Sequence, residues 1–295
     1  MAWTLLLLYL GSVVHATESS LACPDWPTCF GTLVPEMTGG VFWEHLHRLV
    51  AGGLLLMFGL ATYLAYKEPT DRPWIFRACL GGMALLVIQS VFGGLTVLFQ
   101  LPDMISTTHL ALALLFLSLA TVLEAATGDP DATDSGGLPR SSGPSSRSTL
   151  TQLSGGAAVL VFGQSVLGAL VRHTDAGMAC PDFPLCLGQV VPPLVNVPIT
   201  AHFVHRVLAI VTTAVVVGSF LWAYQADVSS SQRRWLAAAA ALVIVQVGLG
   251  IASVLSVLAV APVSLHTLVA AALLSVLVRV ATLARLTEHQ PSSER

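Results

Sequence analysis

The sequence has few charged residues for its length. Of 295 residues only 10% are Asp, Glu, Lys or Arg, whereas 55% are hydrophobic, and the mean hydropathy is +0.79. A soluble domain carries about 25% charged residues, so this chain cannot cover a water-exposed surface of its size. The sequence also lacks a basic patch and a glycine-rich phosphate loop, which argues against a nucleic-acid or nucleotide partner. We therefore predict an integral membrane protein surrounded by lipid.

Positive charge is absent from the first part of the chain, where no Lys or Arg precedes Arg48. A secretory signal peptide would begin with a positively charged segment. We therefore interpret the apolar stretch 2–16 as a short first transmembrane helix and not as a signal peptide.

Apolar runs of roughly 20 residues are long enough to cross a bilayer. Eight runs of this kind or slightly shorter occur, at residues 2–16, 41–66, 74–99, 106–126, 150–171, 199–224, 235–258 and 264–284. A segment rich in Gly, Ser, Pro and Asp separates the fourth from the fifth, which is typical of a flexible linker. The predicted fold is an all-α integral membrane protein with eight transmembrane helices arranged as two pseudo-symmetric four-helix bundles. Its parts are an N-terminal half at 1–127, a cytoplasmic linker at 128–149 and a C-terminal half at 150–286.

Basic residues gather on one set of loops, which indicates the orientation, because cytoplasmic loops carry an excess of Lys and Arg. The opposite set holds only Arg172. We therefore expect a multi-pass protein of a prokaryotic plasma membrane, with both termini and the linker cytoplasmic and residues 17–40 and 173–198 outside. The basic residues on the predicted cytoplasmic side are Lys67, Arg72, Arg77, Arg140, Arg147, Arg233, Arg234, Arg285 and Arg295.

The two halves repeat the same motifs in the same order. ACPDWPTCFG at residues 22–31 returns as ACPDFPLCLG at residues 179–188. Each loop is followed by a helix with a His-Arg pair, then by a glycine-rich span beginning near Gln89 or Gln246, then by a helix with one early histidine. Internal duplication is common in membrane proteins and here predicts two similar sites, one per half.

Four histidines occupy equivalent places, about one turn after the predicted outer start of alternate helices: His47, His109, His205 and His266. Two imidazoles at one depth on neighbouring helices can bind a haem iron from both sides through a neutral ring nitrogen. Polar residues inside a membrane helix usually have a function. Hydrogen bonding between helices is the alternative, but the duplicated register favours two bis-histidine haem sites.

Polar residues next to these histidines distinguish the halves. Glu44 precedes His47 by three positions and shares its helix face, whereas the second half has His202 in that place. A carboxylate beside a haem can move protons or activate water; the alternative is a structural pair with Arg48. Arg48 and its counterpart Arg206 are candidates for contacts with haem propionates, or else are interfacial arginines that extend toward the headgroups.

Two cysteine pairs, Cys23 with Cys29 and Cys180 with Cys186, lie on the predicted outer side, where disulfides persist. Each pair encloses five residues, two of them prolines, but spacing alone does not establish a bond. The pairs are either redox-active or structural crosslinks, and a zinc site that uses all four sulfurs is a further alternative. Cys79, alone in a membrane span, is interpreted as ordinary packing.

The remaining histidines are interpreted as exposed or interfacial. Two of them, His45 and His202, flank the candidate haem ligands and are the ones able to tune the site. The full set is His15, His45, His173, His202 and His289.

The duplicated motifs resemble those of the haem A synthase family. The resemblance covers nearly the whole chain apart from the linker and the tail, and it is specific because the motifs occur twice at matched spacing. It implies an eight-helix enzyme that oxidises a methyl group of haem O to a formyl group, through successive hydroxylations, and so supplies haem A to the terminal oxidase. Haem O synthase and the terminal oxidase assembly are the partners that it implies. The short first span and the long polar linker depart from the family pattern.

The resemblance also implies roles for individual residues. The first-half histidine pair holds the substrate haem, the second-half pair holds a haem b cofactor that relays electrons, and Glu44 is the catalytic carboxylate. The first-loop cysteines match a pair linked to activity in some members, and the second-loop cysteines a pair that not all members share. The matched residues are His47 and His109, His205 and His266, Glu44, Cys23 and Cys29, and Cys180 and Cys186.

Two other functions remain open from the residues alone. A bis-histidine membrane cytochrome b that passes electrons between quinones needs the same histidines but has no need of Glu44. A quinone-linked thiol oxidoreductase would use the cysteine pairs, although such enzymes favour the closer Cys-x-x-Cys spacing. The sequence identifies neither the electron partner nor the oligomeric state. A homo-oligomer is one of the alternatives left open.

Overall fold

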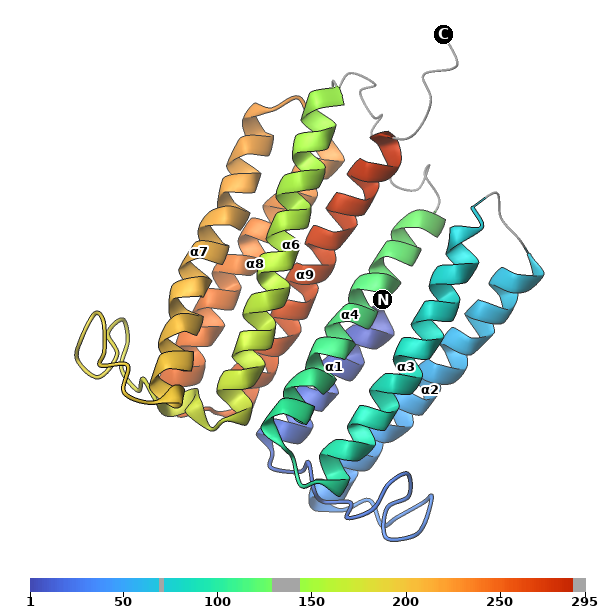
Figure 1. Cartoon of the computed structure of the whole chain (residues 1–295), viewed down its shortest axis with the longest axis vertical. Coiled ribbons are helices and arrows are strands. Elements are labelled where there is room, and N and C mark those ends of the chain that lie inside the picture. The colour runs from blue at the N-terminus through green and yellow to red at the C-terminus, as the bar shows by residue number, and fades with distance from the viewer. Residues whose placement is uncertain (69–71, 129–143, 289–295) are drawn as a thin grey trace.

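A computed structural model describes residues 1–68, 72–128 and 144–288 of the chain, and every long regular element in these ranges is an α-helix (Figure 1). The prediction of an all-helical protein is therefore confirmed for the described residues. A single turn of 3₁₀ helix, η1, spans Ala176–Met178. The helices are α1 (Ala2–Ala16), α2 (Gly39–Lys67), α3 (Trp74–Leu98), α4 (Asp103–Thr127), α6 (Pro144–His173), α7 (Val197–Gln225), α8 (Ser230–Leu255) and α9 (Val260–Glu288).

Seven of the described helices, α2 to α4 and α6 to α9, are long and apolar enough to cross a membrane. A helix suits this solvent because it pairs its own backbone N–H and C=O groups. Helix α1 has 15 residues and so extends about 22 Å, which is shorter than a hydrocarbon core of about 30 Å. It nevertheless packs against α2 and α9.

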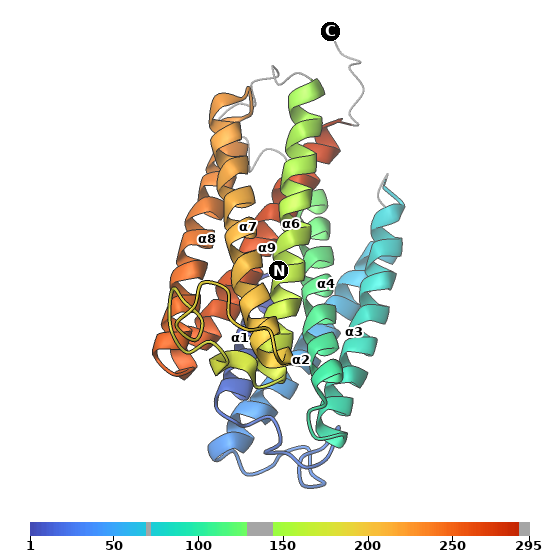
Figure 2. The same ribbon diagram turned by 60° about the vertical axis from the view of Figure 1, so that its left-hand side comes forward.

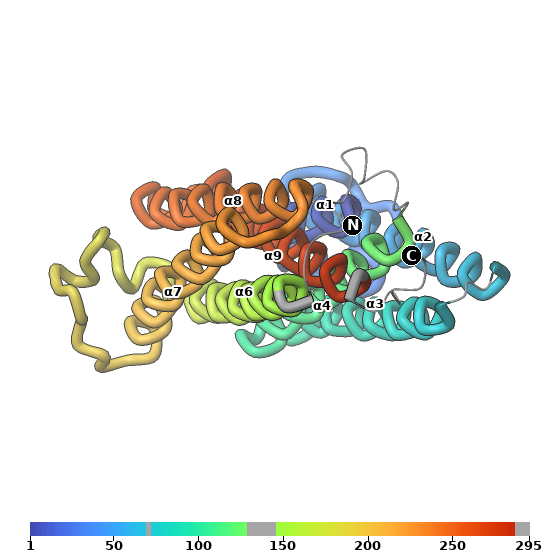
Figure 3. Tube along the Cα trace, turned by 90° about the horizontal axis from the view of Figure 1, so that it is seen from above, coloured from blue at the N-terminus to red at the C-terminus, as the bar shows by residue number. Residues whose placement is uncertain are grey.

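The helices lie roughly parallel to one long axis, and α9 runs through the middle of the molecule (Figure 3). Helix α9 packs against α6 and α8 of its own half and against α1 and α4 of the first half. Leu273, Leu274 and Leu277 of α9 are at most 2% exposed and belong to the largest apolar cluster. A continuous apolar core therefore joins the two halves.

Polar contacts also cross the seam between the halves. Ser12 Oγ of α1 donates to Thr267 Oγ1 of α9 at 3.0 Å. Arg279 of α9 lies 3.5 Å from the carboxylate of Glu124 on α4. Because each contact joins a residue of one half to a residue of the other, the halves form one packed unit.

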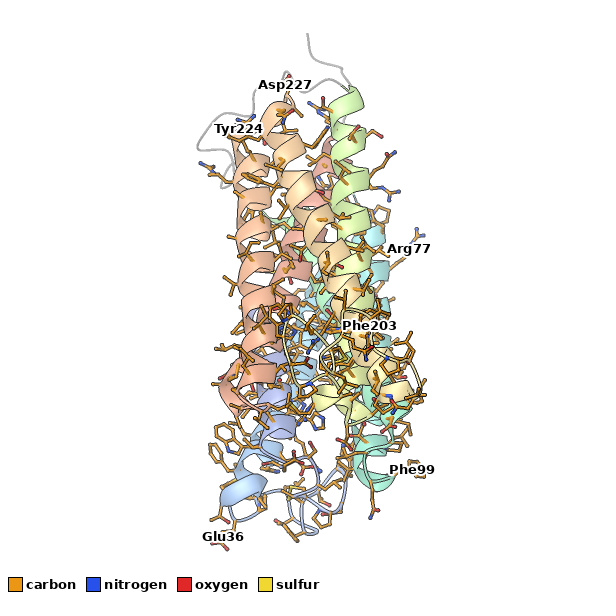
Figure 4. All side chains as sticks on the ribbon, turned by 90° about the vertical axis from the view of Figure 1, so that its left-hand side faces the viewer. Glu36, Arg77, Phe99, Phe203, Tyr224 and Asp227 are labelled. Carbon is orange, nitrogen blue, oxygen red and sulfur yellow. A yellow bond between two sulfur atoms is a disulfide. The ribbon has the colours of Figure 1, made fainter. Side chains whose placement is uncertain are left out.

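The two cysteine loops lie at the same end of the molecule. Residues 17–38 and 174–196 both lie at the lower end of Figure 1, apart from each other, and Figure 2 shows both toward that end after rotation. Glu36 and Phe99 mark this end in Figure 4, whereas Tyr224 and Asp227 mark the opposite one. The duplicated loops therefore lie at one end of the molecule, each beside its own half.

Three helices, α6, α8 and α9, begin at least a full turn earlier than the apolar pattern predicts. Helix α6 begins at Pro144, although we predicted a linker to residue 149, because Ser and Arg residues extend a helix beyond its apolar segment. Helix α8 begins at Ser230 and not at 235, where Ser229 and Gln232 form a capping box that satisfies backbone N–H groups. Helix α9 begins at Val260 and not at 264. Residues 129–143 of the predicted linker, with Arg140, and also His289 and Arg295, lie outside the described residues.

Candidate functional site

The four candidate ligand histidines all lie in the half of the molecule nearer the cysteine loops. They lie about two turns after the first residue of their helices, where the sequence predicted about one turn. The difference arises because α2, α4, α7 and α9 begin before their apolar segments. His47 lies near His109, and His205 lies near His266. The structure therefore places the members of each expected pair near each other, and their binding of a haem stays a prediction.

Each of these imidazoles rests on a glycine of the preceding helix. A Cβ atom added to any of the four glycines would lie within 3.1 Å of the imidazole Cε1 atom, which is closer than nearly all real Cβ contacts. The glycines thus let the ring lie flat against a neighbouring backbone. The distances are 3.1 Å for His47 with Gly11, 3.1 Å for His109 with Gly93, 2.9 Å for His205 with Gly168 and 3.1 Å for His266 with Gly250.

Glutamines lie one turn before three of these glycines. In the second half, Gln164 Nε2 donates to the backbone oxygen of His205 at 2.9 Å and lies 3.1 Å from its Nδ1 atom. His266 Nδ1 lies 3.1 Å from the backbone oxygen of Gln246. In the first half, Gln89 Nε2 lies 3.4 Å from His109 Nε2. Two side-chain amides, of Gln164 and Gln89, and one backbone carbonyl, of Gln246, therefore contact the imidazoles from the preceding helix.

The residues present fit a bis-histidine haem. A ligand histidine commonly donates one ring N–H to a carbonyl and binds iron through the other nitrogen. His266 has this arrangement, since its Nδ1 faces a carbonyl and its Nε2 has no hydrogen bond within the described residues. His47 Nδ1 and His109 Nδ1 are buried without a partner there. Each pair therefore contains an imidazole with a ring nitrogen that has no protein partner among the described residues and could bind a metal, His47 in the first half and His266 in the second.

Glu44 connects the first histidine helix to the first cysteine loop. It is 4% exposed, and its Oε2 accepts a hydrogen bond from the backbone N–H of Cys23 at 2.8 Å. Its Oε1 accepts from Arg48 one turn along the helix. The carboxylate is thus neutralised by a neighbouring guanidinium within the same helix, and it holds the start of the loop in place.

Arg48 binds the first loop through backbone oxygens of the loop. Its guanidinium donates to the backbone oxygens of Asp25 at 2.7 Å and Thr28 at 2.6 Å, and less closely to that of Cys23 at 3.4 Å. Loop carbonyls with no helix or strand partner are thereby satisfied. The contact of Arg48 with a haem propionate stays a prediction.

The second loop is held in the same way. Arg206 donates to the backbone oxygens of Asp182 and Leu185, both at 2.8 Å, and of Cys180 at 2.5 Å. His202 takes the place of Glu44; its Nδ1 lies 2.9 Å from the Ala176 carbonyl, to which it can donate, and 3.4 Å from the backbone N of Cys180. The loops therefore share one design, with a carboxylate in the first half and an imidazole in the second.

Each loop also contains an aspartate that caps backbone N–H groups. The Thr28 hydroxyl, then the N–H groups of Gly31 and Phe30, hold the pKa of the Asp25 carboxyl below its usual value. Asp182 accepts from the N–H groups of Gly188 and Leu187, both at 2.7 Å, which likewise lowers its pKa. Sequence analysis did not single out either aspartate, although both occupy the same place in the repeated motif.

Both cysteine pairs are disulfide-bonded, with S–S distances of 2.03 Å for Cys23–Cys29 and 1.98 Å for Cys180–Cys186. The alternative of one zinc site with four sulfurs is wrong for this structure, because sulfurs bonded to each other are not thiolates. All four sulfur-bearing residues are at most 2% exposed. Cys79 is free and buried among apolar side chains of α3 and α4, as expected for packing.

The first loop also reaches toward the histidine site. Trp26 packs on Gly94 of α3, where an added Cβ would lie 2.7 Å from the indole ring. Gly94 is next to Gly93, on which His109 rests. The disulfide loop is therefore in contact with the helix position that holds a candidate ligand.

The histidines outside the four candidate ligands are less exposed than predicted, as far as the structure describes them. His45 is 6% exposed and lies close to the Cys23–Cys29 disulfide. His15 and His173 pack ring to ring at 4.8 Å between their centroids, where α1 meets α6. These three histidines are therefore not exposed, because they are covered by the loop or lie at the seam between the halves, and their interpretation as interfacial stays a prediction.

Gly11, Gly168 and Gln164 are functional candidates that sequence analysis missed. The spacing Gln-x-x-x-Gly, which occurs at Gln164 as well as at Gln89 and Gln246, could have found Gln164 and Gly168 but not Gly11, which follows Leu7. The pattern was noticed only as a glycine-rich span in two of the four helices.

The chain as a whole is similar to a known protein family and to several known proteins. The model of a family described as cytochrome oxidase assembly protein matches residues 1–278. A protein named heme A synthase from Symbiobacterium thermophilum is 31% identical, over 83% of this chain and 80% of that protein. Proteins of the same name from Halalkalibacterium halodurans (29% identical, 74% and 71% covered) and Shewanella oneidensis (26%, 86% and 85%) are also similar.

Proposed function

This chain belongs to the cytochrome oxidase assembly protein family, and we propose that it is a haem A synthase that oxidises a methyl group of haem O to the formyl group of haem A. The family resemblance seen in the motifs is thereby confirmed. The observation that supports the activity best is the set of four imidazoles in two pairs, each resting on a glycine of the preceding helix. A haem-modifying enzyme needs one place for its substrate and one for a redox partner, and the chain offers two.

We assign the substrate haem O to His47 and His109, and a resident haem b to His205 and His266. Bound haem b would supply electron transfer to or from the substrate site. The protein's own part is to orient both ring planes, through the glycines and glutamines described above, and to exclude lipid from the reacting methyl group. Arg48 and Arg206, at the loop end of each pair, are the candidates for propionate contacts.

Glu44 is the candidate for proton transfer at the substrate site. Oxidation of a methyl group releases protons, which a nearby carboxylate can accept. Glu44 lies one turn before His47 and on the same face of α2. Its pairing with Arg48 keeps a charged carboxylate tolerable at this depth, and its bond to Cys23 connects the proton carrier to the outer loop.

The chain is a multi-pass plasma-membrane protein, and we propose that both of its termini are cytoplasmic and that the cysteine loops face outside. We also propose that α1 is an eighth, short span, and that residues 1–127 and 150–286 form two pseudo-symmetric four-helix bundles joined by a linker. The repeated contacts of His47 and His205 with Gly11 and Gly168 support this duplication. Haem O synthase and the terminal oxidase assembly are the proposed partners.

The two rival functions have less support. A quinone-linked thiol oxidoreductase exchanges disulfides with a partner protein, which requires an accessible sulfur, and here the sulfurs are buried. A plain electron-transfer cytochrome would use the histidines but gives no role to a carboxylate in one half and an imidazole in the other.

The test is to purify the protein from cells that also make haem O, and to identify the haems by pyridine haemochrome spectra and chromatography. We expect haem b together with haem O or A. His109→Ala should keep haem b and stop haem A formation, whereas His205→Ala should lose the haem b signal. Two haems b per chain with no conversion would instead identify an electron-transfer cytochrome, and protein without haem would refute both.

A further inference from the structure

His45 of α2 lies beside the first disulfide and presents a buried nitrogen that the proposed mechanism does not use. A ring nitrogen of His45 and the sulfur atoms of Cys23 and Cys29 all lie within 4.8 Å of one another. His45 is 6% exposed, and its Nδ1 atom is buried without a hydrogen-bond partner within the described residues. Buried polar atoms are almost always paired, so an unpaired one calls for an explanation.

The second half shows that the disulfide loop does not need an imidazole at this place. His45 and Phe203 each stand two residues before a matched candidate ligand, so they are equivalent positions of the repeat (Figure 4). Phe203 has an aromatic ring without a nitrogen, yet the Cys180–Cys186 disulfide forms there as well. Among the described residues, no second set of three His, Cys, Asp or Glu ligand atoms lies as close together as the set around His45.

Two thiolates and one imidazole are an established donor set for zinc, with water in the fourth tetrahedral position. Zn–S bonds of about 2.3 Å and Zn–N bonds of about 2.0 Å place the ligand atoms of one ion roughly 3.5–4 Å apart. Once the sulfurs are no longer bonded to each other, the group is therefore close to the spacing that zinc requires. The two thiolates also neutralise the cation, which reduces the cost of burying its charge.

The order of events follows from the burial of the sulfurs. Cys23 and Cys29 are fully buried when they are bonded to each other, so a metal must bind before the disulfide closes. We propose that Cys23, Cys29 and His45 bind Zn²⁺ in the reduced chain, and that the zinc site and the disulfide are alternative states of the first loop. The loop is then held closed by zinc until an oxidant replaces the metal with the covalent bond.

The two steps balance in protons and electrons. Zinc binding converts the two thiols to thiolates and releases two protons. Closure transfers two electrons from the thiolates to the disulfide of an external oxidant, which takes up two protons and becomes a dithiol while Zn²⁺ leaves. The zinc-bound loop would already be folded against Glu44, which accepts from the Cys23 N–H.

The experiment measures zinc in the full chain while its first loop is reduced. The protein is made in cells that lack the thiol oxidant of the outer compartment, purified without oxygen in a phosphine reductant, loaded with Zn²⁺ and freed of excess metal. We expect about one zinc ion per chain and none after oxidation. Mass spectrometry of alkylated peptides should find Cys23 and Cys29 protected, and Cys180 and Cys186 modified.

Exchange of the residues that distinguish the two halves gives matched variants. His45→Phe should lose the zinc, whereas Phe203→His places an imidazole beside the second cysteine pair and should raise the content to about two zinc ions per chain. With free zinc at about ten times its Kd, the metal-free fraction falls about tenfold. Oxidised glutathione should therefore close the first disulfide about tenfold more slowly in the unsubstituted protein, and without this delay in His45→Phe.

Equal zinc in the unsubstituted protein and in His45→Phe would overturn the proposal, as would protection of Cys180 and Cys186 without Phe203→His. Gel filtration and haem content establish that each variant is folded. If His45→Phe does not fold, Phe203→His decides alone, and a second loop that stays free of zinc counts against the proposal. No measurement requires conversion of haem O, so the outcome is independent of the function proposed above.

Discussion

At the scale of single residues, the most informative comparison is between Glu44 and His202. Glu44 accepts from the Cys23 N–H at 2.8 Å, whereas His202 Nδ1 lies 3.4 Å from the Cys180 N and 2.9 Å from the Ala176 carbonyl, to which it can donate. The second loop therefore forms without a carboxylate at this place. Substitutions can then separate the structural part of Glu44 from its proposed proton transfer.

Glu44→His and Glu44→Gln should keep the first loop and haem binding but lower haem A formation by roughly 10²–10⁴-fold, the usual contribution of general acid–base catalysis. Each replacement retains an acceptor for the Cys23 N–H but has no carboxylate. Turnover with haem O and the haem spectrum provide the two measurements. Glu44→Ala, which also removes the acceptor, is the comparison, and normal turnover in Glu44→His would remove Glu44 from the mechanism.

Gly168→Ala should weaken haem binding in the second half. Its Cβ would lie 2.9 Å from His205 Cε1, and forcing a methyl group into a packed site costs about 1–3 kcal/mol. The haem content per chain after purification measures the effect. Gly163→Ala, on the same helix with nothing within 4 Å of the added Cβ, should retain the haem, and equal loss in both variants would mean that α6 tolerates no alanine.

At the scale of elements, the sequence predicted the helices better than the contacts between them. A membrane helix needs an uninterrupted apolar run, so the eight stretches were placed within a few residues except where Ser, Gln or Pro extended a start, as at Pro144 and Ser230. Such a run does not show which face of one helix contacts its neighbour, because the side chains on every face are mostly apolar. Gly11 and Gln164 were therefore missed, and the contacts of Glu44 depended on an unpredicted loop fold.

The cysteine loops should lose order in acid. The pKa of Asp182 lies below its ordinary value of 3.8, so the capping bonds are at full strength above that pH and are lost as the pH falls through the lowered pKa. Hydrogen exchange of the Leu187 and Gly188 amides, corrected for the intrinsic pH effect, is the measurement. Asp182→Asn should exchange faster at neutral pH and show no further acid transition, whereas an unchanged transition in that variant would assign it to another group.

At the scale of the whole molecule, the distribution of basic residues and the position of the loops make one prediction of orientation. Arg233 and Arg234 lie at the end opposite the cysteine loops, and basic ends remain in the cytoplasm. A phosphatase reporter that is active only outside the membrane should be active when fused after residue 190 and inactive after residue 288. The reverse activities would invert the proposed topology and place the disulfides in the cytoplasm.

The hydrogen bond between Ser12 and Thr267 joins neighbours of the two sites, because Ser12 follows Gly11, on which His47 rests, and Thr267 follows His266. Because the duplicated halves share this boundary, a substitution near it in one half also affects the histidine site of the other half. Residues at the boundary are therefore constrained by both sites. Divergence between the copies should therefore collect where the seam is absent, on the lipid-facing sides of α2, α3, α7 and α8.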